Sequence, residues 1–267
     1  MLPREGVPVP ETTLPTDLQT RISGARPIGV TSPAAAADNI RRMFDTIAPT
    51  YDRANHLLSF GLDRTWWFRA ARAVRPILRR PEAVVLDLCC GTGDMTLALY
   101  RRRPKSAGAA PILAVDFSHN MLALALPKFA GKNIVPIEAD ALRLPVADSS
   151  VDLVTFAFGF RNLSSYPAGL RELHRVLRPG GQIAILECNQ PEGLVGLLYN
   201  LYFQRVLPTI GGWISRDRGA YTYLPHSVSL FPRPAKMKQL ITDAGFKDAT
   251  WTSYTFGTAG LYRAVRP

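Results

Sequence analysis

The sequence has no long hydrophobic run and no apolar leader. None of its 267 residues belongs to a stretch of about 18 consecutive apolar residues, the length that crosses a bilayer. The first residues carry proline and charge, where a secretory signal needs an apolar core of about 7 to 15 residues. We therefore expect a cytoplasmic protein that is soluble or bound at the inner face of the membrane.

Cysteine and acidic residues are also scarce. The chain has 3 cysteines, two of them adjacent, which cannot form a disulfide framework and indicate a reducing compartment. Only 21 acidic residues oppose 32 basic ones, giving a formal charge of +11. Such a charge favours an anionic partner, which is a nucleic acid, an anionic membrane surface or an acidic small molecule.

The chain divides into a tail and one domain. Residues 1–33 are rich in proline, threonine and glycine without helical or strand periodicity, which predicts a flexible tail. The alternative is that this tail docks over an active site. We expect residues 34–267 to form a single domain.

Apolar runs and helical stretches alternate through that domain. Short runs rich in valine, leucine and isoleucine predict buried strands, and the segments between them have helical spacing. The expected strands are 83–88, 111–116, 133–139, 151–158, 181–187, 247–256 and 260–265, with helices at 35–47, 62–78, 120–129, 167–177 and 235–244. This order predicts a doubly wound, mostly parallel, seven-stranded α/β sheet of the Rossmann-like type, with an antiparallel C-terminal strand.

An insertion at 191–234 carries an apolar helix with Leu194, Leu197 and Leu198 at three- and four-residue spacing. These side chains could line a groove for an apolar ligand or rest on a membrane surface. They could equally belong to the core.

The first strand ends in a glycine turn with an acidic residue before it. Asp87 precedes Gly91, Thr92 and Gly93, but Thr96 stands where a dinucleotide fingerprint needs its third glycine. A pyrophosphate ligand is therefore poorly supported. A carboxylate beside a glycine turn suits the amine and sulfonium of S-adenosylmethionine.

Two further strands also end in acidic residues. Asp116 stands about 20 positions after the glycine turn, where a carboxylate accepts both ribose hydroxyls. Asp140 and Ala141 follow the third strand, where they would accept the adenine amino group and leave room for its ring. Each aspartate alone could be a helix cap or turn residue, but three in register favour a nucleoside cofactor.

Several local motifs resemble one family. The chain from about Arg42 onward is similar to the ubiquinone/menaquinone biosynthesis C-methyltransferases, a group of class I methyltransferases. The similarity lies in Phe158–Asn162 (FGFRN), in residues 51–67, in Tyr221-x-Tyr223-Leu224-x-x-Ser227 and, less specifically, in the Arg178–Gly181 turn.

The resemblance implies a reaction and a cofactor site. It assigns Thr92, Asp116, Asp140, Ala141 and position 157 to S-adenosylmethionine, and Ala157 stands where some members have serine. The implied reaction is C-methylation of demethylmenaquinol, because residues 55–64 look more like the menaquinone-forming branch. The alternatives are the ubiquinone precursor or another phenolic or lipid acceptor.

The resemblance also implies catalytic roles. A ring carbon becomes nucleophilic when its neighbouring hydroxyl loses a proton, so the enzyme must stabilise a phenolate-like oxygen. We expect Arg161 to do so as a fixed charge, oriented by Asn162. His56 and Tyr221 are the candidate bases, with Tyr51 and Asp52 behind them, although His56 could equally be a packed residue at a helix start.

Partners follow from the same assignment. We expect a polyprenylated quinol substrate, no metal, and contact with anionic lipid through an arginine-rich helix at 69–80, which could also be a merely solvated face. A homodimer stays open. A nucleic-acid methyltransferase is disfavoured because the loop after the fourth strand reads GFRN, without the Pro-Pro and aromatic residue that grip a flipped base. A binding protein that has lost catalysis is disfavoured by the acidic strand ends.

Overall fold

The computed structural model describes residues 24, 25, 27, 30, 32–106, 108–201 and 218–267. The side chains of residues 33, 200 and 218–222 are not described. The predicted flexible tail, the side chain of Tyr221 and much of the insertion therefore lie outside the described part of the chain.

The predicted sheet is confirmed. It has seven strands in the order β3-β2-β1-β4-β5-β7-β6, and β7 alone runs in the direction opposite to the other strands. The strands are β1 (Val85–Leu88), β2 (Ile112–Asp116), β3 (Ile134–Glu138), β4 (Val151–Ala157), β5 (Leu177–Cys188), β6 (Lys247–Tyr254) and β7 (Ala259–Val265). Chain order reverses between β1 and β4, and open α/β sheets bind ligands at such a switch point.

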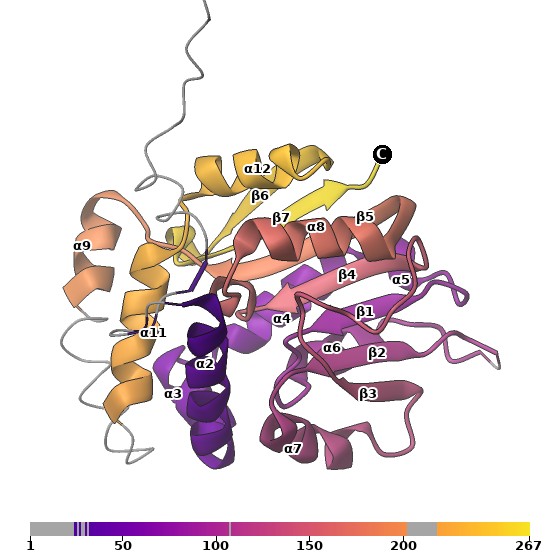
Figure 1. Ribbon diagram of the computed structural model, residues 1–267, viewed down its shortest axis with the longest axis horizontal. Coiled ribbons are helices and arrows are strands. Elements are labelled where there is room, and N and C mark those ends of the chain that lie inside the picture. Colours follow the sequence, from indigo (N-terminus) through magenta and orange to yellow (C-terminus); the bar gives the residue numbers. More distant parts are fainter. Residues whose placement is uncertain (1–23, 26, 28–29, 31, 107, 202–217) are drawn as a thin grey trace, which may run out of the picture.

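Helices connect and cover these strands (Figure 1). They are α2 (Pro33–Ile47), α3 (Tyr51–Leu58), α4 (Leu62–Ala73), α5 (Arg75–Leu78), α6 (Asp94–Tyr100), α7 (His119–Phe129), α8 (Tyr166–Val176), α9 (Gly193–Leu201), α11 (Arg218–Leu230) and α12 (Pro234–Asp243). Short 3-10 turns are η1 (Ala48–Thr50), η2 (Phe160–Asn162) and η4 (Thr255–Gly257).

Two predicted boundaries were wrong. The predicted helix at 62–78 breaks at Val74, because Pro76 has no amide hydrogen to donate to the carbonyl four residues earlier. The predicted strand at 181–187 begins at Leu177, so the Arg178–Gly181 turn lies inside β5. There the pairing register shifts between Val151 and Leu153 of β4.

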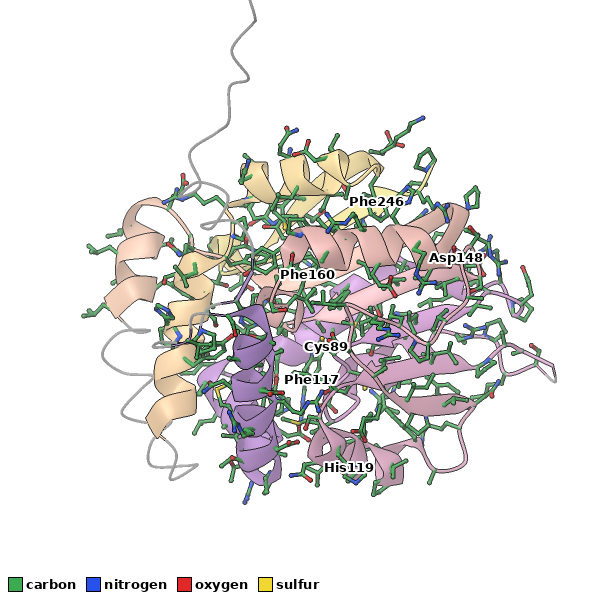
Figure 2. All side chains as sticks on the ribbon, viewed as in Figure 1. Cys89, Phe117, His119, Asp148, Phe160 and Phe246 are labelled. Atoms are coloured by element: carbon green, nitrogen blue, oxygen red, sulfur yellow. The ribbon has the colours of Figure 1, made fainter. Side chains whose placement is uncertain are left out.

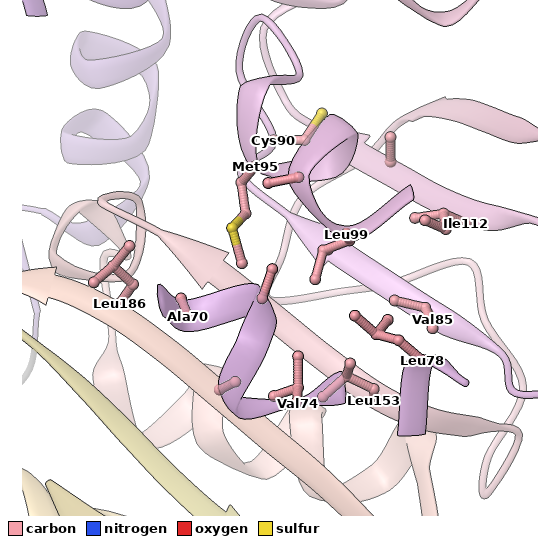
Figure 3. Close-up of a cluster of buried hydrophobic side chains, with 14 of the residues drawn as sticks. Ala70, Val74, Leu78, Val85, Cys90, Met95, Leu99, Ile112, Leu153 and Leu186 are labelled. Atoms are coloured by element: carbon pink, nitrogen blue, oxygen red, sulfur yellow. The ribbon is translucent and has the colours of Figure 1, made fainter. Parts of the chain in front are cut away.

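Both faces of the sheet are buried. Val85 of β1 packs in a cluster with α4, α5 and α6, whereas Leu86, the next residue, packs in a second cluster with α8 and α12. Figure 3 shows the first cluster, in which Ala70 and Val74 meet Leu153 and Leu186 of the sheet. The alternation of strand side chains explains why the strands are apolar throughout.

A further group of helices lies beyond one end of the sheet. In Figure 1, α2, α3, α9 and α11 stand where the strand β4 ends, and α11 contacts both α2 and η2. The last described part of the tail reaches this region too, since the Ala25 amide donates to the Leu163 carbonyl at 2.7 Å. No helix in the described ranges is long and apolar enough to cross a membrane.

Candidate active site

Two hollows open at the carboxyl ends of the strands. We call the larger, of about 270 Å³, the central cavity; it lies between β1, β4, α3 and α4. The smaller, of about 60 Å³, is the side pocket, between β2, β3 and α2. The residues common to both are Tyr51, Cys89, Gly91, Ala157 and Phe158. The two hollows therefore meet where β1 and β4 end.

Asp87 lies at the floor of the central cavity. Its side chain is buried, and its two oxygens accept hydrogen bonds from the Thr96 and Thr155 hydroxyls, each at 2.6 Å. Burial raises the pKa of Asp87 to about 6, although the two hydroxyls oppose the rise. Thr96, which breaks the dinucleotide fingerprint, thus has a role of its own in holding this carboxylate.

Asp116 fixes the glycine turn at the side pocket. Its carboxylate accepts the Gly91 amide at 2.8 Å and the Ser118 amide at 2.9 Å, and burial raises its pKa to about 6. Asp140 and Ala141 line the same pocket. Figure 2 shows Phe117 and Cys89 at this end of the sheet beside α2. The three predicted acidic strand ends therefore reach the two hollows, Asp87 in one and the other two in its neighbour.

The loop after β1 and the loop after β4 lie so close together that no side chain fits at Gly159. A Cβ atom on Gly159 would lie 2.3 Å from the Cβ of Cys89. Cys89 itself adopts φ +51°, a left-handed conformation that is strained for a residue other than glycine. The glycine of the FGFRN motif thus lets the two loops close around the junction of the hollows.

Arg161 is buried beside the central cavity. Its Nη1 donates to Glu187 at 2.8 Å and to the Phe158 carbonyl, and its Nε donates to Ser227 at 3.3 Å. Burial lowers the pKa of Arg161, but Glu187, together with smaller contributions from Cys188, Tyr51 and Tyr223, outweighs that effect and holds the pKa above its ordinary value. Burial raises the pKa of Glu187 in turn, and Arg161 opposes the rise.

Asn162 has a different partner from the predicted one. Its Oδ1 accepts the Tyr223 hydroxyl at 3.0 Å, so it anchors α11 to η2. The described contacts that orient Arg161 come from Glu187, Phe158 and Ser227 rather than from Asn162.

The helix α3 forms one wall of the central cavity. Asp52 accepts the Thr92 hydroxyl at 2.5 Å and Lys128 at 2.8 Å, and Lys128 also pairs with Asp94 at 3.1 Å. Tyr51 lies between the two hollows, and burial raises its pKa to about 12.

Other predicted residues lie elsewhere. His56 is absent from the described lining of both hollows; it pairs with Asp63 at 2.5 Å and stacks on Trp67 with ring centroids 6.1 Å apart. Gly93 also lines neither hollow, and a Cβ there would lie 2.5 Å from the Phe129 ring. The Tyr221 side chain is outside the described residues.

Sequence reasoning missed Glu187. It ends an apolar strand, as Asp87 and Asp116 do, and that shared pattern was available as a signal. Its partner Arg161 was predicted, but nothing in the spacing of the two residues joins them.

A model of the ubiE/COQ5 methyltransferase family matches residues 33–266. The chain belongs to that family. A demethylmenaquinone methyltransferase from Thermus thermophilus is 46% identical over 228 residues, covering 84% of this chain and 100% of that protein. A ubiquinone/menaquinone biosynthesis C-methyltransferase UbiE from Geobacter sulfurreducens is 43% identical, over 84% of this chain and 87% of that protein.

Solved structures support the fold of a class I methyltransferase. A SAM-dependent methyltransferase from Thermotoga maritima has a TM-score of 0.59 at 16% identity, covering 85% of this chain and 99% of that one. The [4+2]-cyclase SpnF has a TM-score of 0.61 at 17% identity, covering 86% and 97%. One fold carries different chemistries, so the site must decide the reaction.

The site fits S-adenosylmethionine, the methyl donor of this enzyme class. Buried carboxylates stand at the ends of β1 and β2, and an open glycine turn at Gly91 lies between them. The chain is thus a methyltransferase that uses S-adenosylmethionine.

Proposed function

We propose that this enzyme methylates a ring carbon of demethylmenaquinol, giving menaquinol and S-adenosylhomocysteine. The observation that carries the proposal is the junction of the two hollows, where a donor that extends from the side pocket to Asp87 would meet an acceptor in the central cavity. The names of the relatives support the acceptor class. The ubiquinone precursor and other phenols are the alternative acceptors.

The donor site is proposed from the acidic strand ends. Asp87 faces the part of the cavity that would hold the amine and sulfonium, and Asp116 would accept the ribose hydroxyls. Asp140 and Ala141 would take the adenine ring against the apolar side of α2. The turn residues Gly91 and Thr92 complete this site. The side chain of Ala157 would contact the donor through its Cβ and has no hydroxyl for a hydrogen bond.

Arg161 supplies the electrostatic part of the mechanism. Among the described residues no partner bonds its Nη2, which leaves that donor for the phenolate-like oxygen of the acceptor. A positive charge held in a buried site stabilises an anion far more than it would in water. Glu187 and Ser227 hold the guanidinium in place, so little reorganisation is needed when charge develops.

Tyr51 is proposed to orient the acceptor rather than to remove its proton. A pKa near 12 keeps its phenol neutral at working pH, so it donates a hydrogen bond. His56 stacks on Trp67 and lines neither the central cavity nor the side pocket, so it is a weaker candidate for the base than its sequence context suggests. A water molecule beside Arg161 is then the simplest proton acceptor.

The polyprenyl tail is proposed to leave the cavity over an apolar rim. Phe60 belongs to the cavity lining, and Leu198 and Phe256 are chain neighbours of the lining residues Tyr199 and Thr255. The three side chains are 76%, 60% and 82% exposed. Leu194 and Leu197 of α9 are exposed as well, so these leucines are not core. We infer peripheral contact of this rim with the cytoplasmic face of a membrane. A homodimer stays a prediction, which analytical ultracentrifugation would test.

The deciding experiment is an assay with radiolabelled S-adenosylmethionine. Demethylmenaquinol and the ubiquinone precursor, each with a short prenyl chain, are offered side by side, with a simple naphthol as control. We expect label in the menaquinol product at least about tenfold faster than in the others. Folded protein that binds the donor and labels none of the three would refute the proposal.

A further inference from the structure

A third, larger hollow lies beside the central cavity. It is a groove of about 1100 Å³ between α3, α4, α5 and α6. Asp52, Trp67 and Asp94 line both this groove and the central cavity, so the two adjoin. We call it the arginine groove, because its lining includes Arg53, Arg64, Arg72, Arg75, Arg79, Arg101 and Arg102.

Ion pairs among the described residues do not balance the charge of these arginines. No ion pair in the described part of the chain involves any of the seven. The two carboxylates in the groove lining, Asp52 and Asp94, are both paired with Lys128. His56, the remaining titratable group of the lining, is paired with Asp63.

The arginines also repel one another. Burial lowers the pKa of Arg102, and the nearby charges of Arg75, Arg101 and Arg72 lower it further. Crowded like charges without acidic partners destabilise a folded chain, so they indicate an anion that binds there.

Apolar surface lies next to this charge. Phe68 is 55% exposed, with the Arg102 guanidinium 4.4 Å from its ring centroid. Leu57, in the last turn of α3, and Phe60, in the turn between α3 and α4, are 55% and 76% exposed. Cations beside exposed aromatic and aliphatic side chains suit the interface of a bilayer, where phosphates adjoin hydrocarbon.

We propose that the arginine groove binds the phosphate headgroups of anionic lipids and so sets the mouth of the central cavity against the bilayer. This inference rests on the proposed function, since it supplies the route by which a polyprenylated quinol enters. A soluble polyanion would need the arginines but not the apolar rim, and for this reason we commit to lipid as the occupant.

The test is co-sedimentation of the full chain with vesicles of phosphatidylglycerol and phosphatidylcholine at low salt. The variant is Arg72→Glu with Arg75→Glu. Its control is Arg143→Glu with Arg171→Glu, which makes the same change in net charge at exposed sites outside the groove lining. We expect the groove variant to bind at least about tenfold more weakly and the control to stay within about twofold.

A second measurement separates this proposal from the proposed function. Methyl transfer to a short-chain demethylmenaquinol free in solution should be equal in wild type and both variants. Loss of transfer in wild-type protein would refute the function and leave the vesicle result standing. Equal loss of vesicle binding in the two charge-matched variants would overturn the proposal that the arginine groove binds lipid. So would tighter binding of RNA or inorganic polyphosphate than of vesicles at equal phosphate concentration.

Discussion

The central cavity and the arginine groove are neighbours with opposite electrostatics. The buried Asp87 lines the cavity, and its pKa is raised to about 6 because its carboxylate lies out of water. Exposed arginines line the groove, and Asp52, Trp67 and Asp94 form the boundary between the two. The basic and acidic residues behind the formal charge of +11 therefore lie in different places. The arginines lie on the outside, next to a site whose buried carboxylate suits a cationic donor.

This comparison separates two uses of charge. In the cavity each charged group is held by hydrogen bonds to specific residues, so its contribution to the reaction depends on its exact position as well as on its sign. In the groove the arginines have few partners, so their number and sign matter more than their positions.

The largest effect is expected from Arg161→Ala. Loss of the positioned cation should lower kcat by about 100- to 1000-fold, as removal of an oxyanion donor does. The affinity for S-adenosylmethionine, measured by calorimetry, should change by less than about threefold. Glu187→Gln keeps the guanidinium but weakens its anchor, and it should cause a smaller loss of kcat. Equal losses of kcat and donor affinity in Arg161→Ala would contradict the role assigned to it.

The next effect tests the contact between the two loops. Gly159→Ala places a Cβ against Cys89, which should lower the free energy of unfolding by about 1 to 3 kcal/mol and reduce activity. Adding Cys89→Gly removes the opposing Cβ and relieves the positive φ, so the double variant should recover most of the stability. Denaturant titration measures both. If the double variant is no more stable than the sum of the two single effects predicts, the contact between Gly159 and Cys89 does not matter.

A pH experiment sharpens the cavity side of the comparison. Because burial raises the pKa values of Asp87 and Asp116 to about 6, the folded protein binds protons that the unfolded chain has already lost. These groups therefore stabilise the free protein below about pH 4, and that stability is lost as pH rises to about 6.

Donor binding should run in the opposite direction. It requires ionised carboxylates, so affinity should fall below pH 6 by up to about tenfold per pH unit for each group. Calorimetric titration and denaturation midpoints at matched pH values would check the two trends. Affinity and stability that fall together on acidification would contradict this account.

The smallest effect concerns the groove. Arg75→Gln relieves repulsion among exposed arginines and should raise stability at low salt by only about 0.2 to 0.5 kcal/mol. The gain should vanish at high salt, where the charges are screened. Arg143→Gln is the control, and thermal unfolding at two salt concentrations is the measurement. A loss of stability in Arg75→Gln would mean that the arginine makes a structural contact.

Much of the fold could be predicted from the sequence, because the parallel strands are apolar runs and the segments between them have helical spacing. The ends of β1 and β2 could be predicted for the same reason, and with them Asp87 and Asp116. The break at Val74 was missed because the helical periodicity continues across Pro76.

The contacts of the site were harder to predict. Arg161 and Glu187 come from different strand ends, and only the sheet order β4-β5 brings them together. The arginine groove was predicted in part as a basic helix. The segment after α6 adds Arg101 and Arg102 to the lining beside the arginines of α4, and periodicity along one helix cannot show that.

Thr96 has a consequence for ligand choice. In a dinucleotide-binding loop this position is glycine, which lets helix and strand pack closely. Here the threonine hydroxyl holds Asp87, so restoring the glycine would leave a buried carboxylate one hydrogen bond short without creating a pyrophosphate site. Attempts to exchange the cofactor of this scaffold must therefore redesign the end of β1 and the start of α6 together.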